Sequence, residues 1–159
     1  MATTFERTLI IIKPDAIQRG LLGEIVHRFE RKGLEVVGMK MTQLNRAILE
    51  SHYAHHKDKP FFDDLANSMM SCPVVVLALE GINAVKACRI VVGQTYGAEA
   101  DAGSIRGDLG MSKQANLVHA SDSTDTAQAE VKRFFAEQEL FSYNKVNRCV
   151  VYGDDELKS

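Results

Sequence analysis

The sequence has no tryptophan, only three prolines and only three cysteines among its 159 residues. The cysteines, Cys72, Cys88 and Cys149, are odd in number and show no C-x-x-C spacing, so they predict neither a disulfide framework nor a zinc site. Cys88 lies among apolar residues, which is typical of a small residue that fills a core. The simplest interpretation is a protein of a reducing, cytoplasmic setting.

Long hydrophobic runs and an excess of positive charge are lacking as well. The first apolar run, Leu9–Ile12, is far too short to span a membrane, and Glu6 and Arg7 precede it, unlike the start of a signal peptide. The formal net charge is -2, which gives no general attraction to anionic membranes or nucleic acid. We therefore expect no membrane contact, and any phosphate site must be a local cluster of cations.

The remaining composition, 45% hydrophobic and 25% charged, is ordinary for a soluble globular protein, and the length suggests one domain over residues 1–159. Apolar periodicity predicts strands over residues 8–12, 34–41, 73–79 and 116–118. It also predicts helices over residues 22–29, 45–53, 83–92 and 123–138, and one that Pro60 opens, with caps at Gly33, Asn45 and Asn83.

The order of these elements favours an α+β fold. Because the strands do not alternate strictly with long helices, a doubly wound parallel sheet fits poorly. We predict instead one sheet covered by helices on one face. Residues 93–116 have no sustained periodicity, and an irregular stretch of this length inside a domain is usually functional or disordered. The tail over residues 146–152 is apolar enough to pack on another part of the protein.

One carboxylate breaks the pattern of the last long helix. Ala127, Val131 and Phe134 form its inward stripe, and Glu130 falls on the same stripe. A buried carboxylate needs a partner, because an unpaired buried charge costs several kcal/mol. The alternative is that Glu130 reaches solvent at the edge of the stripe.

His119 is the natural candidate for that partner. It closes a short apolar strand just before the helix, and the spacing lets the helix fold back and bring Glu130 near the ring. A histidine oriented by a carboxylate is a familiar nucleophile or general base, and the adjoining helix N-terminus favours anions. A lone histidine is more often structural or solvated, so this alternative stays open.

Three cations and an aromatic pair lie at the edges of predicted elements. The cations are Lys13, Arg89 and Arg106. Each one alone is an ordinary solvated surface charge, but together they are able to form the cationic wall of a phosphate site. Phe61 and Phe62 are adjacent, so one ring is free to face outward and stack on a base; ordinary packing of both is the alternative. The sequence contains neither a P-loop nor a kinase-type glycine loop.

Several ordered motifs resemble the nucleoside diphosphate kinase family over nearly the whole chain. The stretch Asn116–Ser123 (NLVHASDS) is similar to the active-site signature of that family. Other matching stretches are Glu6–Asp15, His52-Tyr53, Lys59–Phe62, Gly81–Val85, Gly93–Thr95 and Ile105–Asp108.

The resemblance implies a ferredoxin-like α/β sandwich, with a four-stranded, mostly antiparallel sheet and helices packed on it. It implies a ping-pong kinase reaction that maintains NTP and dNTP pools: His119 takes the γ-phosphate of a nucleoside triphosphate, usually ATP, and passes it to a nucleoside diphosphate such as GDP, CDP or UDP. The cofactor that the resemblance implies is Mg²⁺, carried by the nucleotide phosphates and not by protein ligands. It also implies a homo-oligomer of this chain, for which we favour a hexamer over a tetramer.

The same resemblance assigns site residues by motif. Lys13 and Asn116 contact the ribose hydroxyls; Tyr53, Arg89, Thr95 and Arg106 line the phosphates; Phe61 stacks on the base; Glu130 orients His119, and Ser121 lies beside them. Lys13 and Tyr53 are counted with His119 and Glu130 as catalytic.

Three positions depart from the family pattern. The family usually has glycine after the histidine, whereas this chain has Ala120. Because alanine avoids positive φ, we expect either an ordinary backbone conformation or some strain at this residue. We expect activity to be retained. The loop reads Thr95-Tyr-Gly-Ala-Glu in place of Thr-Asn-Pro-Ala-Asp, which bears on its rigidity and on subunit contacts. Lys113 stands in a stretch that is often apolar and near the base, so base preference is expected to differ.

Two other classes of function are alternatives for this sequence. A non-enzymatic, oligomeric nucleotide-binding or regulatory protein of the same fold would be marked by loss of His119 or of the cations, and neither is lost. A nucleic-acid-binding protein lacks the global basic charge, and the absence of binding to single-stranded DNA at low salt would remove this class.

Overall fold

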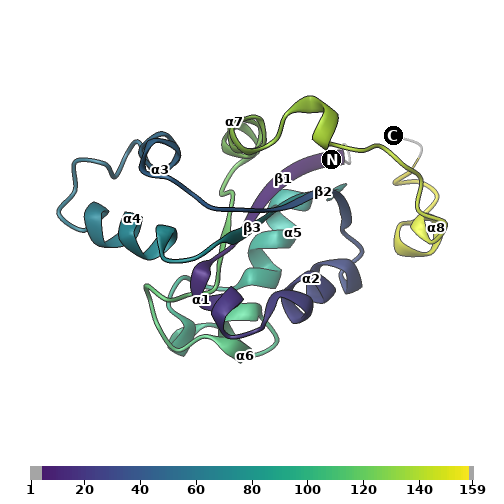
Figure 1. Cartoon of the computed structure of the whole chain (residues 1–159). Coiled ribbons are helices and arrows are strands. Elements are labelled where there is room, and N and C mark those ends of the chain that lie inside the picture. The colour runs from purple at the N-terminus through teal and green to yellow at the C-terminus, as the bar shows by residue number, and fades with distance from the viewer. Residues whose placement is uncertain (1–4, 158–159) are drawn as a thin grey trace.

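The computed structural model, which describes residues 5–157, is built on one four-stranded antiparallel sheet (Figure 1). The strand order is β2-β3-β1-β4. This confirms the α+β class and the ferredoxin-like sandwich. The elements are β1 (Phe5–Ile12), α1 (Pro14–Gln18), α2 (Leu22–Arg31), β2 (Glu35–Thr42), α3 (Arg46–His52), α4 (Phe62–Met70), β3 (Val74–Ile82), α5 (Ala84–Val92), a 3-10 turn (Gly97–Glu99), α6 (Ile105–Leu109), β4 (Val118–Ala120), α7 (Thr124–Phe134), a second 3-10 turn (Glu137–Glu139) and α8 (Arg148–Val151).

The central strand β1 explains why the sheet is covered on both faces. Side chains alternate along a strand, so Leu9 and Ile11 join one core while Ile10 and Ile12 join the other. All four are fully buried. A strand that is apolar at every position has no face to leave to water.

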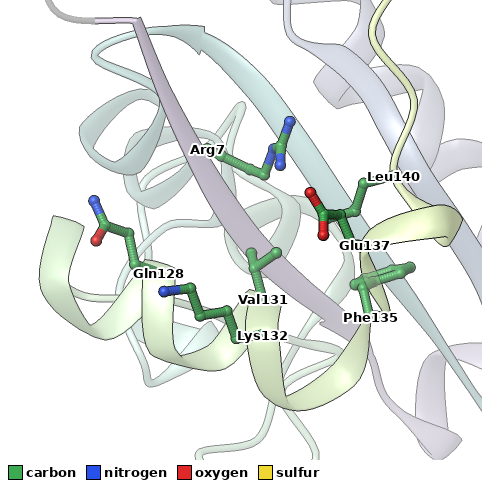
Figure 2. A pocket seen from close by; sticks show the side chains of 7 residues that line it. All are labelled: Arg7, Gln128, Val131, Lys132, Phe135, Glu137 and Leu140. Carbon is green, nitrogen blue, oxygen red and sulfur yellow. The ribbon is translucent and has the colours of Figure 1, made fainter.

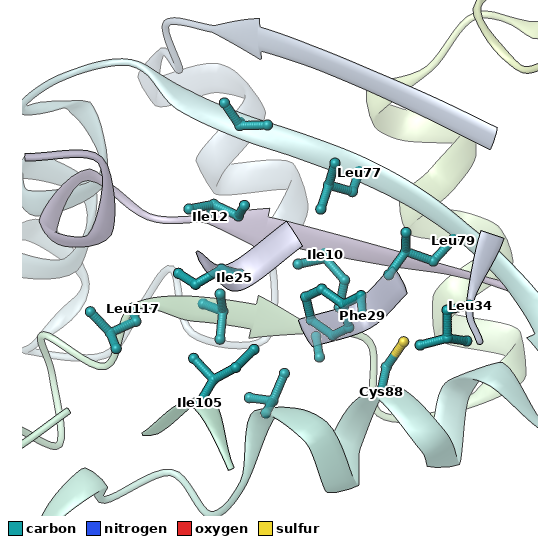
Figure 3. Packing of buried hydrophobic residues seen from close by; sticks show 14 of the residues in the cluster. Ile10, Ile12, Ile25, Phe29, Leu34, Leu77, Leu79, Cys88, Ile105 and Leu117 are labelled. Atoms are coloured by element: carbon teal, nitrogen blue, oxygen red, sulfur yellow. The ribbon is translucent and has the colours of Figure 1, made fainter. Parts of the chain in front are cut away.

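Helices therefore lie on both faces, and the prediction of one covered face is wrong. One core holds side chains of α2, α5 and α6, with Cys88 buried among them as predicted (Figure 3). The other core holds side chains of α3, α4 and α7. In Figure 1, α3, α4 and α7 lie on the upper-left side of the sheet and α2, α5 and α6 on its lower-right side.

Two of the three predicted helix caps are present. After α2, Gly33 has a φ of +99° and the Leu34 N–H donates to the Phe29 carbonyl at 3.2 Å, which is a glycine-dependent helix end. The Asn45 side chain accepts from the Ile48 N–H at 3.0 Å.

The third predicted cap is different in kind. Asn83 occupies the N-cap position of α5, but its φ is +52° and its side chain makes no capping hydrogen bond. The Glu6 carboxylate accepts from the Val85 N–H at 3.0 Å in its place. A residue from a distant strand thus satisfies this helix end, which local sequence cannot indicate.

Several element boundaries also differ from the prediction. Helix α4 begins at Phe62, after Pro60, and α7 ends at Phe134, before residue 138. The stretch 93–116 contains α6 and a 3-10 turn, which are too short to show periodicity.

In the tail, the Tyr152 hydroxyl accepts from the Ile82 N–H at 3.2 Å, but Val146 is 98% exposed, so the tail packs only in part. Within residues 5–157, no helix is long and apolar enough to cross a membrane.

Candidate active site

The site is centred on His119, in the middle of β4. His119 pairs in register with Ile11 of β1, and paired residues share a face of the sheet, so the imidazole lies on the face that α7 covers. Glu130 of α7 is 5% exposed, and its Oε2 lies 2.9 Å from Nε2 of His119. The expected contact between the two side chains is therefore present, and Glu130 does not reach solvent as the alternative required.

The Glu130 carboxylate is held in its ionised form. The Ser121 hydroxyl donates to the same Oε2 at 2.6 Å. Burial raises the pKa of Glu130, but the hydrogen bond and charge of His119 and the bond from Ser121 outweigh it, and the pKa lies below its usual value. Because Glu130 binds Nε2 of His119, Nδ1 is the ring nitrogen left for a reacting group.

A strained turn precedes β4. Leu117 has a φ of +74°, a conformation that costs a non-glycine residue roughly 1–3 kcal/mol. The Leu117 N–H donates to Asp15 at 3.0 Å and its carbonyl accepts from the Lys13 N–H at 2.8 Å. These bonds hold the turn and place Lys13 next to the start of β4.

Lys13 and Asn116 are bonded to each other. The Lys13 ammonium donates to Asn116 Oδ1 at 2.7 Å, and Asn116 Nδ2 donates to the Thr95 carbonyl at 3.2 Å. Burial, followed by the nearby charge of Arg106, lowers the pKa of Lys13 to about 8. The ammonium is therefore still mostly protonated at neutral pH, next to a buried second cation.

Arg106 ties the long loop to β4. Its guanidinium donates to the carbonyls of Asn116 at 3.1 Å, Gly93 at 3.1 Å and Val118 at 2.6 Å. Burial, and then the charge of Arg89, lowers its pKa to about 10. Arg106 remains charged at neutral pH, and three bonds hold it in one position.

These side chains surround a cleft. One part has a volume of about 670 Å³ and the adjoining part about 240 Å³; Tyr53, Thr95, Arg106 and His119 line both. The cleft brings together eight of the nine predicted site residues: Lys13, Tyr53, Phe61, Thr95, Arg106 and His119 in the larger part, with Arg89 and Glu130 in the smaller. Asn116 is buried behind this wall, against Lys13.

The departures from the family pattern are accommodated locally. Ala120 lies in regular antiparallel pairing with Ile10 and is not among the described residues with positive φ, so its backbone is ordinary. At Gly97 a side chain would meet the Gly110 carbonyl group at 2.5 Å, which explains glycine there. Lys113 is exposed and lines the cleft together with Phe61.

Sequence reasoning missed several residues of the cleft. His52 lies with its ring centroid 4.6 Å from that of His119, in an edge-to-face arrangement. The sequence indicated His52 in two ways, by the matching stretch His52-Tyr53 and by its position three residues after Leu49 on the inward side of a short helix, but it was assigned no role. The other missed lining residues are His55, His56, Asp64, Leu65, Gln114 and Thr126. The cleft is also lined by Val118, Ala120 and Asp122, which belong to the matching stretch Asn116–Ser123 but were assigned no role.

A second hollow, of about 470 Å³, lies beside α7 (Figure 2). Apolar side chains of Val131, Phe135 and Leu140 line it, together with Arg7 and Lys132. Among the described residues, no predicted site residue and no histidine lines it. The cleft at His119 is therefore the candidate active site.

The fold and the cleft define a class of protein. A histidine held by an ionised carboxylate, a buried Arg106 and a half-buried Lys13, and a half-exposed Phe61 ring (49% exposed) suit a phosphorylated, base-bearing ligand. These features are typical of a phosphotransferase that works on nucleotides.

Comparison with known proteins agrees with this class. The family model described as "Nucleoside diphosphate kinase" matches residues 6–140. A nucleoside diphosphate kinase of Parabacteroides distasonis is 52% identical over 96% of this chain and 99% of its own length, and one of Archaeoglobus fulgidus is 47% identical over 94% and 99%. The structure of a Halobacterium salinarum nucleoside diphosphate kinase in complex with CDP superposes with a TM-score of 0.91, at 40% identity, covering 94% of this chain and 99% of that one.

The chain belongs to the nucleoside diphosphate kinase family. The family function is ping-pong transfer of a phosphoryl group from nucleoside triphosphates to nucleoside diphosphates, which maintains nucleotide pools. The chain is accordingly a phosphotransferase.

Proposed function

We propose that His119 carries the phosphoryl group and that its Nδ1 is the attacking atom. The observation that supports this is the contact of Nε2 with Glu130 at 2.9 Å. A carboxylate that accepts a hydrogen bond from Nε2–H fixes the proton on that nitrogen and leaves the lone pair of Nδ1 free. It also stabilises the positive charge that the ring gains during attack.

In the first half-reaction, Nδ1 forms a bond to the γ-phosphorus while the bond from that phosphorus to the bridging oxygen breaks. The diphosphate leaves with the electron pair of the broken bond, and His119 is left phosphorylated with Nε2–H still bonded to Glu130. In the second half-reaction, a terminal oxygen of another nucleoside diphosphate attacks the same phosphorus and restores free Nδ1. No proton has to leave Nε2 at any stage.

The cations supply the charge that this transfer requires. Phosphoryl transfer depends mainly on positioning and electrostatic stabilisation. Arg89 and Arg106, with Tyr53 and Thr95, line the cleft beside His119, and this position supports their proposed role in binding the phosphates. Lys13 lies in the larger part of the cleft, and we assign it, with Asn116 behind it, to the ribose and the neighbouring phosphate.

Mg²⁺ is proposed as the cofactor, bound by the nucleotide phosphates. The one cluster of potential ligands in the described part of the chain is His52, His119 and Glu130. This cluster does not suit Mg²⁺, which prefers oxygen ligands and near-octahedral geometry, and its carboxylate is already bonded to His119 and Ser121. When bound, the ion neutralises phosphate charge; the chain's own contribution is the set of cations.

A homo-oligomer, with a hexamer favoured over a tetramer, is proposed as the working assembly. Exposed apolar side chains that a neighbouring copy would bury support this. Met39 and Met41 of the edge strand β2 are 50% and 59% exposed, Met111 of the long loop is 79% exposed, and Val150 is 81% exposed. We propose a cytoplasmic location on the ground that all three cysteines are free.

Phe61 provides the test of broad nucleotide use. With ATP as donor, we expect turnover with GDP, CDP and UDP as acceptors. Phe61→Ala should weaken all of them together, by about tenfold or more in KM, because base stacking contributes about 1–3 kcal/mol and does not read base edges. Steady-state kinetics with each acceptor measures this.

The matched control is Phe141→Ala. Phe141 is 63% exposed and is not among the residues lining the cleft, so its kinetics should equal those of the wild type. A loss confined to one base in Phe61→Ala would contradict stacking and would indicate recognition of base edges, for which Lys113, in the same part of the cleft, is a candidate.

A further inference from the structure

Arg133 of α7 has an unusual set of partners. It lies three residues after Glu130 on the same helix, a spacing at which a glutamate and an arginine ordinarily pair. Within residues 5–157, however, Glu130 forms its contacts with His119, Ser121 and His52 and makes no ion pair with Arg133. The Arg133 guanidinium faces α3, where Nε donates to the Ser51 hydroxyl at 3.0 Å and Nη1 lies 3.3 Å from Nδ1 of His52.

The second contact determines the tautomer of His52. A guanidinium has only donors, so Nδ1 of His52 must be the acceptor and Nε2 must carry the proton. Burial and then the charge of His119 lower the pKa of His52 to about 3, which keeps the ring neutral at physiological pH. The same Nδ1 that faces Arg133 also lies 3.8 Å from Oε1 of Glu130, so His52 contacts both charged groups.

Stability does not explain a histidine at this position. The His52 side chain is completely buried, and its Nε2 has no hydrogen-bond partner among the described residues. A buried donor without a partner disfavours the folded state. A phenylalanine would fill the same space between Tyr53, His119 and Phe134 and avoid that cost, but it would provide no acceptor for Arg133.

We infer that His52 is a positioning residue that holds Arg133 away from Glu130, so that no ion pair with Arg133 competes with the hydrogen bond between His119 and the carboxylate. This rests on the proposed role of His119 and Glu130. An arginine within about 4–6 Å makes a carboxylate less basic by about 1–3 pKa units. A Glu130 paired with Arg133 would therefore accept more weakly from Nε2–H and support less positive charge on the attacking ring.

Four variants separate this role from simple packing. His52→Phe and His52→Gln both lack an acceptor in the place of Nδ1 and should phosphorylate His119 on the order of tenfold more slowly. His52→Asn keeps an oxygen where Nδ1 was and should stay near the wild-type rate. Arg133→Gln alone should also be near wild type, because it removes the competing cation.

The decisive variant is the double substitution His52→Phe with Arg133→Gln, which should regain most of the rate that His52→Phe loses. The measurement is the single-turnover rate of phosphoenzyme formation at saturating Mg-ATP, together with ATP affinity, which should change little. Thermal unfolding of each variant shows that it is folded, and His52→Gln takes the place of His52→Phe if the latter is not.

A double variant that stays as slow as the single His52 variant would overturn the inference, since the ring itself would then be required. An Arg133→Gln variant as slow as His52→Phe would overturn it too, because Arg133 would then assist the reaction directly. Failure of the wild type to form any phosphoenzyme would instead contradict the proposed function, so the two failures are distinguishable.

Discussion

His119→Gln should abolish phosphoryl transfer and leave the fold unchanged. Glutamine offers no nucleophilic nitrogen, while its side chain still fits on β4 against Glu130. We expect turnover of ATP and GDP to fall to the level of the assay background, with circular dichroism and thermal unfolding close to wild type. Nucleotide binding should persist, because Lys13, Arg89 and Arg106 are untouched.

His27→Gln is the matched control for that variant. His27 is an exposed histidine of α2, on the opposite face of the sheet from α7, and its loss should leave turnover unchanged. Transfer by His119→Gln at the wild-type rate would disprove the phosphohistidine mechanism. It would leave a nucleotide-binding protein whose phosphoryl transfer runs through some other group.

Glu130→Gln should slow transfer on the order of a hundredfold, the scale on which correct proton placement contributes to catalysis. The amide has the shape of the carboxylate but carries no charge, and its NH₂ group is able to donate to Nε2 and fix the wrong tautomer of His119. Single-turnover phosphorylation by Mg-ATP is the direct measurement. The affinity for ATP should change less than the rate, because Glu130 holds the histidine and not the phosphates.

Glu137→Gln is the control here, since Glu137 is an exposed carboxylate in the turn after α7. Equal rates for Glu130→Gln and the wild type would mean that the short contact with His119 has no catalytic role. Loss of stability without loss of rate in the folded fraction would point to a structural ion pair.

Periodicity was sufficient for most elements of the fold because it reports directly on burial. The apolar runs at β1 and β3 and the stripe of α7 were predicted from local spacing alone. The sequence of β1 also indicates that both faces of the sheet are covered, because Leu9 to Ile12 are apolar without alternation. The prediction of one covered face was wrong although this pattern was present. Short elements such as α6 were not predicted, because a helix of five residues shows no apolar period.

The residues of the site also divide into those that the sequence indicates and those that it does not. Glu130 stood out as a charge on an apolar stripe, so its contact with His119 followed from helical geometry. The family resemblance supplied Tyr53, Thr95 and Asn116, which no local rule marks. Nothing in local sequence showed that Asn116 bonds to Lys13 across 103 positions or that Arg133 faces His52, because such contacts depend on how distant elements meet in three dimensions.

The non-enzymatic alternative requires a damaged site, and the structure gives no support to damage at the predicted residues. His119, Glu130 and Ser121 form one hydrogen-bonded group, and Ala120 keeps an ordinary strand backbone after the histidine. The cations around the cleft are present and two of them, Lys13 and Arg106, are held by internal hydrogen bonds. A site assembled this completely is expected to be active.

The most direct test of the central claim is a phosphoenzyme assay on the wild-type protein. It is incubated with Mg²⁺ and γ-labelled ATP, the label is mapped and tested for acid lability, and unlabelled GDP or CDP is then added. We predict an acid-labile label on His119 that moves to either diphosphate. Folded, nucleotide-bound protein that takes up no label, or a label on another residue, would contradict the mechanism and leave Glu130 without its proposed role.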